Sequence, residues 1–342
     1  MGKRVVATMV TWGDRTDEAV YLAHRGLFDS VRPIHGGNVR ADGTWIERAY
    51  RIDAPFSQAL PALAREASQS YCPAIAGYDH AEWSALLDNP RAWQGVVDGL
   101  LALIDSRFDK PWDGCLFAFE GTELEQQDRA TELISMLADA VRAEGLPAWM
   151  NVMGREGDAG LSYDGAYALD YRALNRVVDG FTYGIAGYWK PLPRSIGPFW
   201  WANGCLGYAV DDCRIPARKI TVNLGGWSRL MPPSGGTSGT LYFYDDALEL
   251  VGDAPIRWME QNDNGIIREH YARLEDGSTM WLNDGRWVRE RLPLLDRRGI
   301  ESVSFFRPAM AAPDTWRTIA DWKRPRESRP ADRFYQSPNW CA

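Results

Sequence analysis

The sequence contains no cluster of basic residues and no long apolar segment. Its net charge is −8, and its Lys and Arg residues are dispersed, which argues against nucleic acid and anionic membranes as partners. No stretch is long and apolar enough to span a bilayer, so we expect no membrane insertion. The first residues, MGKRVVATMVTW, lack the apolar core and cleavage site of a secretory signal. We therefore expect an intracellular protein, or a secreted one whose signal has been removed.

Residues that build disulfide frameworks and metal sites are scarce. The five cysteines are an odd number, which argues against a complete disulfide framework. Cys72 and Cys115 lie in strand-like runs and are expected in the core, whereas pairing of Cys205 with Cys213 stays open. Four histidines and the lack of CxxC or HxxxH spacing argue against a zinc site. We expect no metal and no other cofactor.

Tryptophan, by contrast, is abundant. The chain has 16 Trp among 342 residues. Indole rings are large and mostly apolar, so they are stable where they are buried or stacked on another flat surface. We expect several of them to line an aromatic groove of the kind that stacks on the faces of sugars.

Short β-like runs alternate with segments of helical periodicity. In 91–106 and 125–144 apolar residues recur at spacings of three and four, typical of helices with one buried face, and 167–178 and 285–298 are similar. This alternation predicts parallel strands joined by helices. No Gly-rich phosphate-binding motif follows the first strand, which argues against a dinucleotide fold. Eight strands favour an α/β fold of the (β/α)8 type, a TIM barrel; they are 4–11, 29–34, 71–77, 113–119, 147–153, 179–186, 219–225 and 301–306.

One interval between strands is too long for a single helix. About 75 residues separate 219–225 from 301–306, far more than a usual connection. Within it, IIREHYARLEDG and STMWLNDG are typical of a β-hairpin with Asp276-Gly277 at its turn. We predict a small α+β insertion between strands seven and eight. The expected division is 1–228 for the first part of the barrel, 229–284 for the insertion, 285–324 for the last helix and strand, and 325–342 for an irregular tail.

Candidate functional residues follow from the barrel itself, because its active site lies at the carboxyl ends of the strands. Glu120 ends the otherwise apolar strand in WDGCLFAFEG (112–121). The other strand ends carry mainly aromatic residues, which suit a sugar-binding pocket with general acid catalysis. The candidates beside Glu120 are Trp12, His35, Tyr78, Asp79, Asn151, Glu156, Tyr183, Tyr188, Trp189, Trp227, Arg229, Phe306 and Arg307.

Three runs match motifs of a known family in order and spacing. Asp113, Gly114 and Glu120 fit D-G-x-x-x-D-x-E, Tyr183 falls in a run like M-x-Y-D, and 219–229 is similar to K-x-x-x-G-x-P-x-Y-G-R, with Trp227 at the Tyr position and Arg229 kept. Over roughly residues 3–322 the chain thus resembles family 18 glycoside hydrolases, the chitinase-like barrels that include spore-cortex and peptidoglycan-associated members. The resemblance implies a carbohydrate partner, Glu120 as general acid and Tyr183 in the catalytic site. Trp12, Tyr78, Asp79, Asn151, Glu156, Trp189, Trp227, Arg229 and Phe306 are the expected substrate contacts.

The departures from the family pattern concern its mechanism. In that family the N-acetyl oxygen of the substrate attacks the anomeric carbon, and an Asp two residues before the Glu orients it. Here that position is Ala118, and Gly184 stands where the sixth strand has its Asp. If the chemistry were unchanged, losing one such preorganised group would cost roughly two to three orders of magnitude in rate. Standard chitinase chemistry is therefore not expected.

Several candidates also have structural interpretations. Asp113 is expected to be a cap or ion-pair partner at the other end of the barrel, and Tyr183 is either a ligand contact or a buried hydrogen-bonded side chain. Trp12, Trp189 and Trp227 either face the groove or pack between helices. Asp79 and Glu156 are either second carboxylates or loop acids; His35, before two glycines, fits a turn; Arg229 and Arg307 fit an anion site or ion pairs.

Three functions remain open. The first is a glycosidase that acts on an amino-sugar or related polysaccharide, with a mechanism altered by Ala118. The second is a glycan-binding protein that has lost catalysis, although retention of Glu120 favours the enzyme. The third is a cell-wall-contacting module of a phage-like particle.

Overall fold

The computed structural model describes residues 2–11, 15–34, 38–46, 54–77, 79–106, 112–119, 122–158, 168–187, 195–233 and 239–325. Its main sheet is parallel, with the strand order β5-β2-β1-β16-β10-β9-β8-β7-β6. The bounds are β1 Arg4–Met9, β2 Ser30–Pro33, β5 Ser70–Tyr71, β6 Ala74–Gly77, β7 Cys115–Phe119, β8 Ala148–Met153, β9 Gly180–Gly184, β10 Ile220–Asn223 and β16 Ser302–Phe306.

The nine labelled strands form eight strands of a closed barrel. Strands β5 and β6 are two halves of one extended segment, interrupted at Pro73, which has no N–H to donate. The first half pairs with β2 and the second with β7, and a bridge between Ile34 and Ala74 joins the two edges. The predicted TIM barrel is confirmed, and each strand predicted from the sequence overlaps an observed one.

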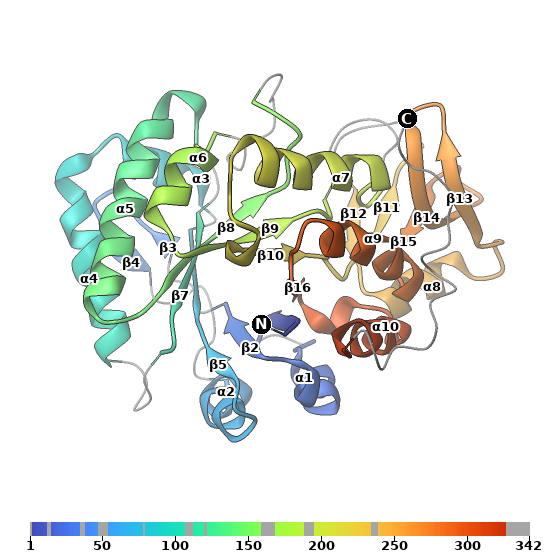
Figure 1. The fold of residues 1–342 in the computed structure, drawn as a ribbon, viewed down its shortest axis with the longest axis horizontal. Coiled ribbons are helices and arrows are strands. Elements are labelled where there is room, and N and C mark those ends of the chain that lie inside the picture. The colour runs from blue at the N-terminus through green and yellow to red at the C-terminus, as the bar shows by residue number, and fades with distance from the viewer. Residues whose placement is uncertain are drawn as a thin grey trace.

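Helices surround the barrel and bury their apolar faces against it (Figure 1). The predicted helices 91–106 and 125–144 correspond to α4 and α5, and on α5 Leu133, Ile134, Leu137 and Val141 are all fully buried. The bounds are α1 Glu18–His24, α2 Pro55–Glu66, α3 His80–Leu87, α4 Trp93–Ser106, α5 Gln127–Ala143, α6 Tyr171–Val177, α7 Phe199–Gly207, α9 Gly285–Arg297 and α10 Pro313–Lys323.

A second, antiparallel sheet lies between β10 and β16 in sequence, as expected for the α+β insertion. Its order is β12-β11-β15-β14-β13, and the hairpin β14–β15 turns at Gly277, whose φ of 81° favours glycine. Figure 1 shows this sheet at one end of the molecule, with α4 and α5 at the other. The bounds are β11 Ser228–Met231, β12 Thr240–Tyr242, α8 Tyr244–Val251, β13 Arg257–Asn262, β14 Gly265–Arg273 and β15 Thr279–Leu282, and a two-stranded ribbon pairs β3 Asn38–Val39 with β4 Trp45–Ile46.

The residue boundaries of the insertion, 229 and 284, remain a proposal. The C-terminal tail after residue 325 falls outside the described residues.

Asp113 has the structural role that the sequence predicts. Its backbone N–H donates to the carbonyl of Tyr71, and its carboxylate accepts the N–H of Tyr71 at 2.8 Å. These two hydrogen bonds fasten the start of β7 to β5, at the end of the barrel away from the strand carboxyl ends.

Candidate functional site

The alternation of side chains along each strand separates those inside the barrel from those behind it. One small apolar cluster draws only on strands and their carboxyl ends, without any helix: Val10, Ile34, Ala74, Leu116 and Ala118, with Trp149 and Phe306 packed against it. The positions between these residues, such as Phe117 and Phe119 on β7, belong to the large core that includes the helices. Leu116 and Ala118 therefore face the barrel interior.

Phe306 and Trp227 lie together at the carboxyl ends of β16 and β10. Their rings meet edge to face, with centroids 6.0 Å apart. Gly225 precedes Trp227 with a φ of 73°, and a Cβ there would lie 2.8 Å from Ala186, so only glycine fits this turn. The indole Nε1 of Trp227 is buried and has no hydrogen-bond partner within the described residues. This pair is the part of the predicted aromatic site that the described residues bring together.

Tyr183 faces away from the barrel interior. On β9 it shares the outer side with Phe181 in the large core and is fully buried. Its hydroxyl accepts the N–H of Arg155 at 3.2 Å and lies 3.0 Å from the carbonyl of Cys205, to which it donates. Burial raises the pKa of this phenol well above its usual value. The prediction of a catalytic role for Tyr183 does not fit this position, because the inward side chains of β9 are Thr182 and Gly184.

The two predicted second carboxylates lie in different environments. Asp79 is exposed and caps α3, accepting the N–H groups of Ala81 and Glu82 at 3.1 Å each, which is a usual role for Asp before a helix. Glu156 is half-buried, and its Cγ and Oε1 lie 3.3 Å from where a Cβ on Gly204 of α7 would stand. No described strand of the barrel carries an acidic side chain on its inward face.

Arg229 and Asn151 differ in accessibility. Arg229 on β11 is almost completely buried, and its Nη1 donates to the carbonyl of Ser195. This contact connects the insertion to the segment before α7. Asn151 on β8 faces the barrel interior and is half-buried, so its amide is positioned to meet a ligand that enters the barrel.

Arg307, just after β16, is half-buried, and its Nη2 donates to the carbonyl of Arg15 at 2.6 Å. The other candidates lie outside the described residues. They are Glu120, Trp12, Tyr78 and Trp189, together with His35 and Tyr188. Their predicted roles stay predictions.

One inward residue of chemical interest was not predicted from the sequence. Arg32 on β2 has an exposed fraction of 3%, its Nη1 donates to Thr182 Oγ1, and its guanidinium lies 4.9 Å from the ring centre of Trp149. Burial lowers the pKa of Arg32 to about 10. The signal was available, because Arg32 is a charged residue within the otherwise apolar run SVRPI.

No group of three or more His, Cys, Asp or Glu side chains among the described residues is arranged to hold a metal ion. None of the helices in this part of the chain combines the length and apolarity that crossing a bilayer requires.

Comparison with known proteins identifies the fold. No protein-family model and no curated protein matches the sequence, but solved structures do. A chitinase from Chromobacterium violaceum superimposes with a TM-score of 0.77 at 18% identity, covering 95% of this chain and 100% of that one. The fold is chitinase-like.

Two further matches broaden this chitinase-like group. The spore cortex-lytic enzyme SleL from Bacillus megaterium gives a TM-score of 0.74 at 16% identity, covering 93% of this chain and 74% of SleL. YKL-39, solved in the presence of chitooligosaccharides, gives 0.70 at 12% identity, with 94% and 99% covered. The predicted resemblance is confirmed at the level of the fold.

Proposed function

We propose that the protein is a glycoside hydrolase that acts on an amino-sugar-containing or related glycan, with Glu120 as the general acid. The direction of β7 is the observation that supports this most directly. Leu116 and Ala118 face the barrel interior, and the alternation of an extended strand predicts the same side for the residue two positions later. An acid there would reach the carboxyl end of the barrel, where such enzymes bind substrate.

The aromatic pair supports a sugar ligand in the same place. Phe306 packs against both the inner cluster and the large core, and it keeps part of its surface exposed beside Trp227. Aromatic faces next to polar groups are typical of carbohydrate sites. Solved relatives of this fold include chitinases and spore-cortex enzymes, which fits the same substrate class.

The proposed mechanism departs from the substrate-assisted one. That route needs polar groups around the N-acetyl substituent, and the inward positions next to the predicted acid are Ala118 on β7 and Gly184 on β9. Neither side chain can hydrogen-bond an acetamide. In our proposal Glu120 protonates the leaving oxygen, and the sugar is held by groups other than an Asp at position 118.

A non-catalytic glycan-binding protein is the second candidate. The observation that favours it is the lack of any acidic side chain on the described inward faces, because glycosidases of the two-carboxylate type need a second acid about 5 Å or 6.5–9.5 Å from the first. Retention of Glu120 favours the enzyme.

Hydrolysis of defined oligomers separates the two candidates. The substrates are GlcNAc oligomers, GlcNAc–MurNAc oligomers and neutral glucose oligomers, incubated with the wild type and with Glu120→Gln. We expect turnover by the wild type and a loss of about 100-fold or more in Glu120→Gln, as for removal of a general acid. Glu125→Gln is the matched control, since Glu125 is an exposed acid in the short helical turn Leu124–Gln126 that follows β7. Binding of an oligomer by both proteins without turnover would show that the chain binds glycans without cleaving them.

A further inference from the structure

The interior of this barrel is more polar than that of most TIM barrels, where branched apolar residues dominate. The inward side chains of β1, β2, β8, β9, β10 and β16 include Thr8, Arg32, Asn151, Thr182, Asn223 and Ser304. Polar side chains inside a protein are stable only when their hydrogen bonds are made. Their partners therefore show what the interior is built to hold.

Arg32 is a buried cation with no acidic partner among the described residues. Its described contacts are the hydroxyl of Thr182 and the ring of Trp149, and its Nε has no hydrogen-bond partner. No acidic side chain among the described residues forms an ion pair with it. An unpaired buried charge is strongly destabilising, so this position is costly unless an anion occupies it in the working state of the protein.

Two hydroxyl groups in the same part of the interior also lack a hydrogen-bond partner among the described residues. Thr8 is the register partner of Arg32 on β1, and the buried Oγ1 of Thr8 and Oγ of Ser304 have no partner in the described part of the chain. Alternate strands fill each interior layer of such a barrel. The registers place one residue from each of four alternate strands in the layer of Arg32: Arg32 of β2, Leu116 of β7, Thr182 of β9 and Ser304 of β16. Arg32 and Ser304 thus share one layer, and Thr8 adjoins Arg32 on the neighbouring strand, so that three potential hydrogen-bond donors lie in this part of the barrel interior.

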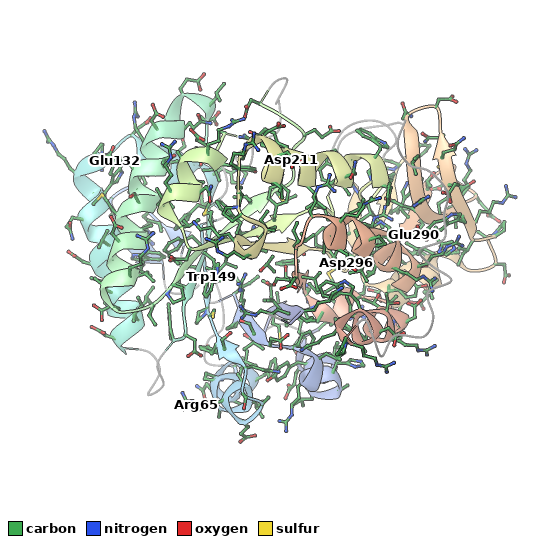
Figure 2. All side chains as sticks on the ribbon, viewed as in Figure 1. Arg65, Glu132, Trp149, Asp211, Glu290 and Asp296 are labelled. Carbon is green, nitrogen blue, oxygen red and sulfur yellow. The ribbon has the colours of Figure 1, made fainter. Side chains whose placement is uncertain are left out.

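The layer nearer the carboxyl ends has its small side chains on the β7 and β9 side, while Ile34 and Phe306 occupy the β2 and β16 side. Above Leu116 and Thr182, two residues further along their strands, stand Ala118 and Gly184, which have the smallest possible side chains. On β8 the inward residues are partly exposed and the outward ones are buried. In a filled barrel the inward side chains would be buried as well. Figure 2 labels Trp149, the ring below Arg32, near the middle of the molecule.

From this geometry we infer that the barrel interior below Ala118 is an oxyanion site, and that it receives a carboxylate carried by the sugar bound at the barrel mouth. The inference rests on the proposed glycan function and specifies the substrate class as acidic. The guanidinium of Arg32 and the hydroxyl groups of Thr8 and Ser304 can all donate hydrogen bonds. Such a set is well suited to a carboxylate, which only accepts them. Ala118 stands where the family has an Asp. Its replacement removes the carboxylate that would orient an acetamide, and it also removes a negative charge that would repel an acidic substituent of the sugar.

Binding of two matched oligosaccharides tests the site. A GlcNAc tetramer and a GlcNAc–MurNAc tetrasaccharide, which differ in the lactyl carboxylates, are titrated calorimetrically at low salt with the Glu120→Gln protein, so that cleavage does not interfere. We expect the acidic oligomer to bind at least about tenfold more tightly, as an ionic hydrogen-bonded contact provides. Arg32→Met, which keeps the length of the side chain and removes its charge, should abolish this preference and leave the neutral oligomer unaffected.

Further variants separate binding from folding. Arg65→Met is the matched control, because Arg65 is an exposed arginine on α2, at the edge of the molecule in Figure 2, and it should retain the full preference. Thr182→Val removes the hydroxyl that holds Arg32 and should reduce the preference. Ala118→Asp places a carboxylate of the protein itself over the site, so it should also weaken the acidic oligomer selectively even if Arg32→Met does not fold. Acetate alone, titrated in parallel, shows whether a free carboxylate is sufficient.

Two results would overturn the inference: equal affinity of the Glu120→Gln protein for the two oligomers, or a preference that survives in folded Arg32→Met. These failures are distinct from failure of the proposed catalysis. Turnover without any acidic preference removes the oxyanion site alone, whereas an acidic preference without turnover removes the enzyme alone.

Discussion

The hydroxyl of Tyr183 is held behind the sheet by backbone groups of Arg155 and Cys205. Because side chains alternate along a strand, the neighbouring residues Thr182 and Gly184 face the opposite side, into the barrel. A displacement of one residue in a motif alignment exchanges these two environments. At the scale of a single residue, the face of the strand therefore decides between a ligand contact and a structural hydrogen bond.

Tyr183→Phe tests this placement. The variant removes the hydrogen bonds that the buried Tyr183 hydroxyl makes with the N–H of Arg155 and the carbonyl of Cys205, which costs about 1–3 kcal/mol in the free energy of unfolding. Urea unfolding at neutral pH measures the loss. Oligosaccharide affinity should be unchanged, since the ring packs away from the barrel interior. A variant of normal stability with reduced affinity would instead place Tyr183 at the ligand.

At the scale of elements, a buried ion pair fastens the second sheet to the barrel. Glu269 on β14 and Arg291 on α9 are both completely buried, 3.2 Å apart. Glu269 also accepts the N–H groups of Ile196 and Gly197 at 3.0 Å each, and Arg291 donates to the carbonyl of Gly197. Burial raises the pKa of Glu269, and the guanidinium and these two N–H groups oppose that rise. The pair thus connects the insertion, α9 and the segment before α7.

Glu269→Gln should therefore destabilise the whole chain. Removing one charge leaves Arg291 buried and unpaired, which costs about 3–5 kcal/mol in the free energy of unfolding. The matched control is Glu260→Gln, because Glu260 on β13 pairs with Arg268 at the surface and such exposed pairs contribute less than about 1 kcal/mol. Urea unfolding of both variants decides the point, and equal losses would contradict the fastening role.

A second connection between elements depends on pH. Asp17, before α1, is fully buried and accepts the N–H groups of Val10 and of Ala309, each at 2.7 Å, which joins the loop after β1 to the turn after β16. Burial raises the pKa of Asp17 from 3.8 to about 6, against the opposing effect of these hydrogen bonds. The folded chain thus takes up this proton at a higher pH than the unfolded chain does. The resulting stabilisation is complete below about pH 4 and is lost as pH rises through about 6.

Asp17→Asn isolates this contribution, because asparagine does not titrate. The free energy of unfolding of the wild type minus that of Asp17→Asn should increase between pH 7 and pH 4.5, by at most about 3 kcal/mol for a pKa change of this size. Urea unfolding of both proteins at the two pH values gives the difference. A difference that is constant, or that decreases on acidification, would show that the hydrogen bonds keep Asp17 ionised.

At the scale of the whole molecule, the sequence was sufficient to predict the architecture. Strands such as 147–153 and helices such as 125–144 show their periodicity clearly, because one face of each is buried. The long interval after β10 and the Asp276-Gly277 turn likewise indicated the insertion. Eight repeated units leave few arrangements other than a closed barrel.

The candidate site was less predictable, for a physical reason. Burial does not alternate regularly at the ends of strands, so the sequence pattern does not tell which of two neighbouring residues faces the ligand. Tyr183 and Arg229 are both buried, and both make structural hydrogen bonds. Arg32 lies inside a strand, where its charge stands out in the sequence but does not show which groups it contacts. Its neighbours come from strands far apart in sequence, and only the closed barrel brings them together.

The packing of the whole chain also predicts its thiol chemistry. Cys72, Cys115, Cys205 and Cys213 form no disulfide and are buried. Burial raises the pKa of the Cys72, Cys115 and Cys213 thiols, so all four should resist alkylation and disulfide exchange. Of five cysteines, at most one should react with Ellman's reagent in the native protein, and all five after unfolding in denaturant without reductant. The melting temperature should not change when reductant is added. Three reactive thiols after unfolding, with a lower melting temperature in reductant, would instead reveal a disulfide, and peptide mapping would show whether it joins Cys205 to Cys213.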